Sequence, residues 1–388
     1  MEAVLEKIGM NQKSQKLNWR NYQREIIPVV VIILCSLVFD GWSDGAFISP
    51  RNLSNLSRQV CVNLTLAVGM TLVILTSGID LSVGSVLALS GMAAAISQVH
   101  WQWSTMGFTG ACLSFVFALT VGGLSGAITG FAVSKLKITP FIVTLGMMVI
   151  ARGVTLIISS AQAVAPLGET LGKLSSDYLS PESSIGLLIS LAILSLILGL
   201  RQFLTKKNTI SEALKTTIAI VALCTLGIYA FGNYRGIPYM VFISILCAAA
   251  AIFTLKYTRF GRFIYAIGGN RDAAELSGVP VAKTLWLTYF VMGCLAGLAG
   301  VMDSTRVNGA VPSAGELGEL DAIAAVVIGG TSLMGGAGSI GGTVLGVLIM
   351  GVLNNGMSLV GVSEHYQKVF KGIVIILAVY LDLRSKKK

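Results

Sequence analysis

The sequence predicts an all-α polytopic membrane protein, and three observations support this prediction. Hydrophobic residues make up 54% of the 388-residue chain and charged residues 12%, about half the ~25% charged residues of a soluble domain. The mean hydropathy is +0.80. Apolar runs near the length needed to cross a bilayer, about 20 residues, recur along the chain. With so few charges to cover a soluble surface, we exclude a cytosolic enzyme, a disordered chain and a secreted disulfide-rich module.

Twelve apolar segments are predicted as membrane helices. No small-residue cleavage site follows the first run, which comes after the polar residues 1–25, so we expect a retained helix and not a cleavable signal. The tenth and eleventh segments are interrupted by glycine and are expected to form either a re-entrant hairpin or two crossings. The segments cover residues 26–42, 59–79, 83–99, 106–133, 140–160, 184–200, 216–232, 239–256, 285–304, 321–334, 339–357 and 367–382.

Positive charges predict how these segments are oriented. If the N-terminus is cytoplasmic, the inside segments carry 20 of the 28 Lys and Arg residues and the outside segments carry 6. This bias places both termini in the cytoplasm. We therefore expect one transmembrane domain over 26–382, between a cytoplasmic segment, 1–25, and a basic tail, 383–388. The net charge of +10 then reflects orientation and not nucleic-acid binding, because no basic stripe alternates with aromatics.

Motifs for chemistry are nearly absent. The six cysteines lie in apolar runs without a C-x-x-C pair, and the chain has two histidines, so we expect no disulfide framework and no metal site. The sequence GWSDG at 41–45 matches a nucleophile motif by spelling, but a membrane helix precedes it instead of a strand. No nucleotide-binding P-loop is present. We therefore expect no catalytic site and no bound cofactor, and any use of ATP must come from a partner.

Two segments are candidates for a translocation path. In the first, Asp80 lies between two apolar helices, and an intramembrane carboxylate is a functional candidate by default; alternatively Asp80 or Ser82 caps the third helix. The second, 319–343, has paired glycines, and broken helices at membrane depth line cavities or are buried in protein. A tight packed hairpin is the alternative there. Polar side chains that could face a solute in or after this segment are Thr331, Ser332, Asn354 and Asn355.

The cytoplasmic loop 257–284 contains the pattern of a short capped helix. Gly268 and Gly269 predict a turn, Asn270 is a candidate N-cap, and residues 271–277 follow as a short helix. Gly278 ends this helix and a proline at 280 prevents its continuation. Such an element is either a docking site for a partner or a solvated helix on the membrane surface.

Four segments resemble the permease subunits of bacterial ribose/xylose/galactose-class ABC importers. They read VGMTLVILTSGIDLSVGS, RFGRFIYAIGGNRDAAELSGV, ELDAIAAVVIGGTSLMGGAGSIGGTVLG and LNNGMSLVGVSEHYQ. The similarity extends from about residue 45 to the end. Two additional apolar helices in 184–232 make the chain more similar to D-xylose or multiple-sugar permeases than to the shorter ribose permease.

The resemblance implies a transporter of the bacterial cytoplasmic (inner) membrane. Two permease copies form a homodimer with two ATP-binding subunits, or one fused subunit, which use ATP and Mg²⁺. An extracytoplasmic sugar-binding protein delivers the sugar and supplies its selection, so we expect the permease itself to bind sugar weakly. In such permeases the loop corresponding to 268–280 docks on the ATPase, which implies a coupling role for Gly269, Asn270, Arg271, Asp272, Ala274, Glu275 and Gly278.

Other interpretations of the sequence stay open. An ion-coupled secondary transporter would need membrane-buried acid–base pairs, and Asp80, Arg152 and Lys371 are its obvious candidates, although they are scattered in the sequence. An intramembrane enzyme would need a catalytic constellation, which is not found. An ABC permease for another small polar solute, such as a furanone or a branched-chain amino acid, is a further alternative.

Overall fold

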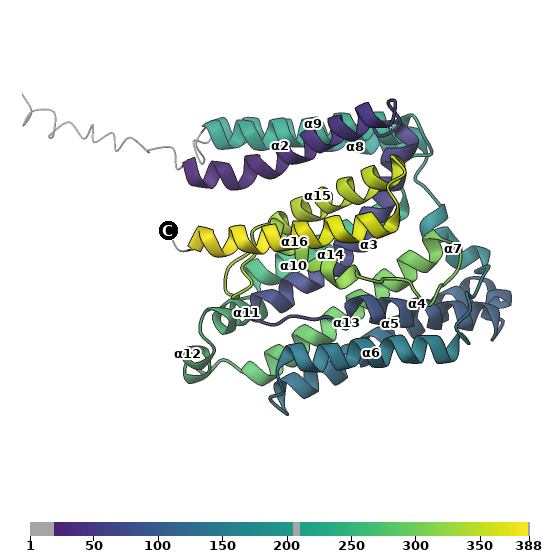
Figure 1. Cartoon of the computed structure of the whole chain (residues 1–388). Coiled ribbons are helices and arrows are strands. Elements are labelled where there is room, and N and C mark those ends of the chain that lie inside the picture. The colour runs from purple at the N-terminus through teal and green to yellow at the C-terminus, as the bar shows by residue number, and fades with distance from the viewer. Residues whose placement is uncertain (1–18, 205–209, 387–388) are drawn as a thin grey trace, which may run out of the picture.

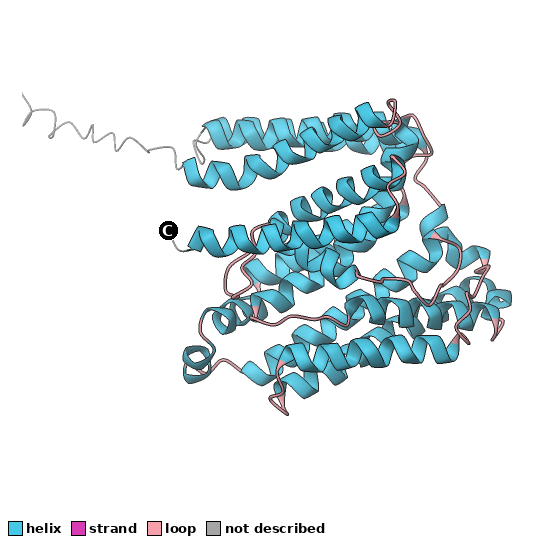
Figure 2. Cartoon of the chain, viewed as in Figure 1, coloured by secondary structure: helices cyan, strands magenta, loops and turns pink. Residues whose placement is uncertain are grey.

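The computed structural model describes residues 19–204 and 210–386, which form a bundle of helices joined by loops (Figure 2). Within these residues there is no strand beyond two isolated bridges, Val164 with Ala310 and Tyr178 with Pro238. The all-α prediction is therefore confirmed for the described chain.

Each of the twelve predicted segments overlaps a helix. The longer helices are α2 (Trp19–Trp42), α3 (Pro50–Leu75), α4 (Val83–Val99), α5 (Gly107–Ser134), α6 (Pro140–Ile158), α8 (Pro181–Leu204), α9 (Ile210–Gly232), α10 (Tyr239–Tyr257), α13 (Val281–Arg306), α15 (Ile340–Leu359) and α16 (Glu364–Lys386). The shorter ones are the 3-10 turn η1 (Trp103–Met106), α7 (Glu169–Ser176), α11 (Arg259–Gly269), α12 (Arg271–Leu276) and α14 (Gly318–Ile328).

Length and composition identify which of the described helices can cross a membrane. Seven are long and apolar enough, and three further apolar stretches are shorter. With 11 residues, α14 is only about 16 Å long, too short for a hydrocarbon core of about 30 Å. This length fits the predicted break in the glycine-rich segment. Twelve crossings and the side on which the termini lie stay predictions.

The long helices run between two ends of the bundle (Figure 1). The start of α2, the end of α16 and the short helices α11 and α12 lie at one end, which we call the α12 end; α7 lies at the opposite end, which we call the α7 end. Since α13 begins five residues after α12 and runs away from it, Arg306 marks the α7 end. The two ends of the described chain therefore share one end of the bundle.

Glycines bring the backbones of α5 and α13 into contact. A β-carbon at Gly122 of α5 would lie 2.8 Å from the Cα of Gly297 in α13, and one at Gly126 would lie 2.9 Å from the Cα of Gly293. Helices that associate in lipid gain from such close packing, because no hydrophobic force drives them together. The glycines spaced four residues apart in α5 and in α13 thus form a packing seam between the two helices.

Two helices begin inside the bundle, where their N-termini meet. A β-carbon at Gly84, in the first turn of α4, would overlap the Gly315 carbonyl oxygen and lie 2.6 Å from Oε2 of Glu319 in α14. Only glycine allows the start of α4 to approach the segment 307–317 this closely. The starts of α4 and α14 are therefore packed as one unit.

Candidate functional site

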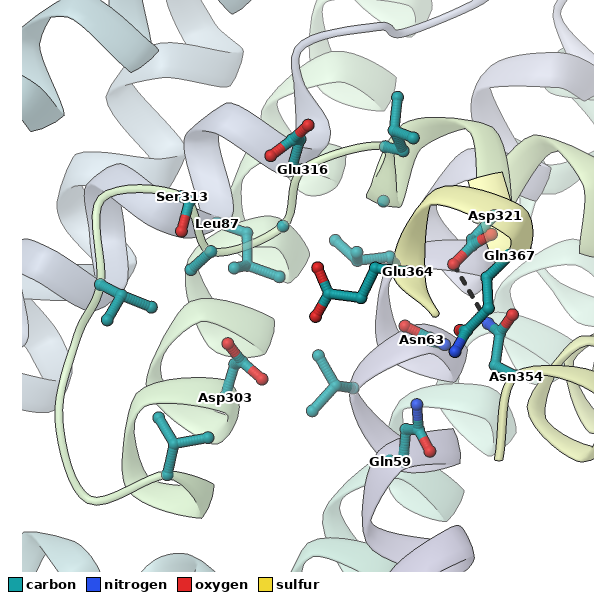
Figure 3. A pocket seen from close by; sticks show the side chains of 18 of the residues that line it. Gln59, Asn63, Leu87, Asp303, Ser313, Glu316, Asp321, Asn354, Glu364 and Gln367 are labelled. Carbon is teal, nitrogen blue, oxygen red and sulfur yellow. Dashed lines mark hydrogen bonds between the residues drawn. The ribbon is translucent and has the colours of Figure 1, made fainter. Parts of the chain in front are cut away.

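A cavity of about 470 Å³ opens among α3, α13, α14, α15 and α16 (Figure 3). Its walls come from the middle of α3, Leu87 of α4, the end of α13, the segment 307–317, the first turn of α14, the end of α15 and the first turns of α16. These parts all lie toward the α7 end, opposite α12. The volume falls within the ~300–1,000 Å³ common for small-molecule sites, so the cavity can admit a small solute.

Ion pairs neutralise most of the charge on the cavity wall. Arg306 pairs with Asp303 at 2.8 Å, and Lys371 pairs with Asp321 at 2.8 Å. Lys368 donates a hydrogen bond of 2.9 Å to Glu316 in the segment 307–317, and this ammonium holds the pKa of the Glu316 carboxyl below its ordinary value. Three basic side chains line the cavity, and each is committed to a carboxylate.

The segment 307–317, which forms one side of the cavity, is held by Arg152 from α6. The guanidinium of Arg152 donates hydrogen bonds to the carbonyl oxygens of Pro312 and of Ala314, the latter at 2.9 Å. Arg152 was a candidate for ion coupling on the sequence. In the structure its bonds go to backbone carbonyls, so it positions the cavity wall.

Of the six residues predicted for the translocation path, only Asn354 lines the cavity. Its amide donates a hydrogen bond of 3.3 Å to Asp321, which ties α15 to α14. The neighbouring Asn355 exchanges two hydrogen bonds, of 2.8 and 3.2 Å, with Asn52 of α3. One step along a helix rotates the side chain by about 100°, which is why consecutive asparagines have different surroundings.

The remaining path candidates lie away from the cavity. Asp80 is 3% exposed and accepts hydrogen bonds from the backbone N–H and the hydroxyl of Ser82, at 2.9 and 2.6 Å, just before α4 begins. Asp80 therefore orders the turn that precedes α4, and no side-chain hydrogen bond caps the helix at Ser82. Thr331 and Ser332 are buried in the segment 329–339 between α14 and α15.

Most of the residues that line the cavity were not predicted from the sequence, and three of them carry polar groups at membrane depth. Gln59 and Asn63 of α3 and Asp321 of α14 line the cavity. Two amides four residues apart in an apolar helix were a signal, because they share one helix face. Asp321 lies in the apolar segment ELDAIAAVV, just before the paired glycines, and a single acidic residue there gives no local signal of a cavity.

The short helix α12 forms as the sequence predicts. The Asn270 side chain caps it by accepting a hydrogen bond of 3.0 Å from the backbone of Ala273, and Gly278 follows with φ of +81°. Ala274 is buried against a small apolar cluster with Ile267 and Val281. Among the predicted docking residues, Ala274 therefore supports the helix from within, whereas Arg271, Asp272 and Glu275 are exposed.

The end of α12 presents a large apolar side chain that the sequence analysis did not single out. Leu276 is 90% exposed, the highest value among the exposed large hydrophobic residues described. It lies at the α12 end, outside the apolar membrane-length helices. Together with the exposed Arg271 and Glu275, Leu276 gives α12 a surface that carries both apolar and charged side chains.

Beneath α12, the last turn of α11 touches two other segments at what we call the α11 junction: residues 265–268, 75–77 and 334–338. The Tyr265 hydroxyl donates to the Gly338 carbonyl at 2.9 Å, and the Ser77 hydroxyl donates to the Met334 carbonyl at 2.7 Å. The N–H of Gly336 donates to the Leu75 carbonyl at 3.0 Å. The junction thus joins α11 to the segments that precede α4 and α15.

Comparison with known proteins identifies the relatives of this chain. It is 38% identical over 373 residues to the xylose transport system permease protein XylH of Escherichia coli (strain K12), covering 94% of this chain and 93% of that protein. It is also 38% identical over 381 residues to XylH of Haemophilus influenzae, covering 96% and 99%. The ribose import permease protein RbsC of Escherichia coli (strain K12) is 38% identical over 369 residues, covering 95% of each.

No solved structure matches the chain significantly. The family model for the permease component of branched-chain amino acid transport systems matches residues 52–379. This range contains the cavity, α12 and the α11 junction, and it covers most of the 388 residues. The chain therefore belongs to this family of transport-system permeases.

Proposed function

We propose that this chain is the permease subunit of a bacterial ABC importer that carries a monosaccharide, xylose or a related pentose or hexose, across the inner membrane. The observation that carries the proposal is 38% identity to xylose and ribose permeases over nearly the whole length of both chains. The subunit is not an enzyme. A partner ATPase hydrolyses ATP, and the permease binds no cofactor of its own.

The ATPase docks on α12 at the cytoplasmic face. Support comes from the exposed Leu276 with its charged neighbours Arg271 and Glu275, and from the positive charges that predict a cytoplasmic position for this loop. When ATP binding moves α12, the α11 junction passes this movement to the segments before α4 and α15. The starts of α4 and α14 then shift together, because they are packed against each other.

Solute enters the cavity from the α7 end, where an extracytoplasmic binding protein releases it. The paired charges on the cavity wall suit a neutral solute, whereas an amino acid carboxylate would find every lining cation already in an ion pair. Two copies of the permease form a homodimer in the complete transporter.

The test is uptake of labelled D-xylose and D-ribose into liposomes that contain the permease with its ATPase, with the binding protein added outside. We expect uptake that requires ATP and the binding protein and that persists when a protonophore abolishes the proton gradient. Uptake by the permease alone, or uptake driven by an ion gradient without ATP, would show an ion-coupled transporter. ATP-dependent uptake of leucine without that of any sugar would support the amino acid alternative.

A further inference from the structure

We infer that Gln59 and Asn63 of α3 form a solute-binding site inside the permease, which hydrogen-bonds neighbouring hydroxyl groups of a neutral monosaccharide. The inference rests on the proposed function and names residues that hold its solute. Both residues line the cavity of about 470 Å³, and Figure 3 shows both amides on its wall, with Asp303 of α13 facing them.

The position of the two amides is set by helix geometry. Residues 59 and 63 are four apart and so lie above one another on the same face of α3. Most of the rest of α3 is buried apolar packing, with 18 of its 26 residues buried. A polar pair on such a helix is costly in a membrane unless it faces a cavity or a partner, and here it faces the cavity.

Neither amide is engaged by the protein. Within the described residues, Gln59 and Asn63 form no hydrogen bond, ion pair or ring contact. Other amides in apolar helices are bonded: Gln98 donates to Ser114 at 2.7 Å, and Asn355 exchanges two bonds with Asn52. Because Gln59 and Asn63 open onto the cavity and do not pair within the described part of the protein, both amides are available to a ligand.

The chemistry of the free groups fits a sugar. An amide carries both donors and an acceptor, and each sugar hydroxyl is likewise a donor and an acceptor. The Glu364 carboxylate, at the start of α16, extends toward the same space (Figure 3) and adds a further acceptor. The cations of the wall are paired with carboxylates, so an anionic solute has no free partner there.

The test uses near-isosteric variants in the complete transporter, with ATPase and binding protein, reconstituted in liposomes. Asn63→Leu and Gln59→Met remove the hydrogen-bonding groups and keep the side-chain shape. Asn55→Leu is the matched control, because Asn55 is an exposed residue of the same helix that does not line the cavity. At equal amounts of assembled complex, we expect each amide variant to lower D-xylose uptake about fivefold, the effect of one lost hydrogen bond, and the control to match the wild type.

A second measurement reads occupancy directly. In the Asn63→Cys complex, D-xylose should slow modification of residue 63 by a small thiol reagent, as followed by mass spectrometry. Wild-type uptake in both amide variants, or an equal loss in Asn55→Leu, or modification of residue 63 at a rate independent of xylose, would overturn the inference. If the wild-type complex takes up no monosaccharide at all, the proposed function fails instead.

Discussion

We predict that Gly268→Ala uncouples ATP hydrolysis from sugar uptake. Gly268 lies in the last turn of α11, and a β-carbon there would overlap the Leu75 carbonyl oxygen and the backbone nitrogen of Gly336. Both neighbours are backbone atoms, which cannot rotate away as a flexible side chain can. The methyl group must therefore push α11 away from the segments that precede α4 and α15.

The magnitude follows from the packing. Extra methylenes in a close-packed site cost about 1–3 kcal/mol, and 1.4 kcal/mol corresponds to a factor of ten in an equilibrium. We thus expect the joined arrangement of the α11 junction to lose roughly 5- to 150-fold in population. Uptake should fall by at least fivefold per ATP hydrolysed, while the ATPase continues to turn over.

The assay compares xylose uptake and phosphate release in the same liposomes. Gly341→Ala is the matched control, because Gly341 lies in the first turn of α15, next to the α11 junction, and its β-carbon would have no neighbour within 4 Å. The control should behave as the wild type. A wild-type ratio of uptake to hydrolysis in Gly268→Ala, or an equal defect in Gly341→Ala, would refute the idea that the junction transmits the movement of α12.

Three further predictions concern docking and the cavity wall. Leu276→Ala should weaken retention of the ATPase on the purified permease by roughly thirtyfold, because about 2 kcal/mol of apolar burial is lost; full retention would remove Leu276 from the contact. Arg271→Ala combined with Glu275→Ala should leave membrane insertion intact and abolish coupled uptake, and normal uptake in this variant would contradict the docking role of α12. Arg152→Met should lower the unfolding free energy by about 2–3 kcal/mol, since two charge-assisted bonds to the segment 307–317 are lost; an unchanged melting temperature would show that these bonds are not stabilising.

The helices were predictable because the membrane imposes a simple rule on the sequence. Every spanning segment must be apolar over a sufficient length, so hydropathy found each long helix. The helix boundaries were harder to predict than the helices themselves. The helix α3 begins at Pro50, well before the expected residue 59, because Ser49 caps it and proline suits the first helical position. The prediction of α12 was confirmed because the residues that begin and end this helix, Asn270 and Gly278, lie next to it in the sequence.

The cavity was not predictable, because it depends on distant residues. Gln59, Asp303 and Glu364 come from helices far apart in the chain, and no local pattern brings them together. The sequence drew attention to polar residues near glycine breaks, such as Asp80 and Thr331, and the structure places these in helix starts and turns. Which face of a helix meets a cavity is decided by its neighbours, which a single sequence does not reveal.

Asn270 has a consequence for how force travels through the protein. It is at once the last capping position of α11 and the N-cap of α12, so a single ordered residue separates the two helices. A connection of one residue leaves no flexible loop between α11 and α12. Whatever tilts α12 must tilt α11 as well, so the pair works as a bent lever whose short arm is α12.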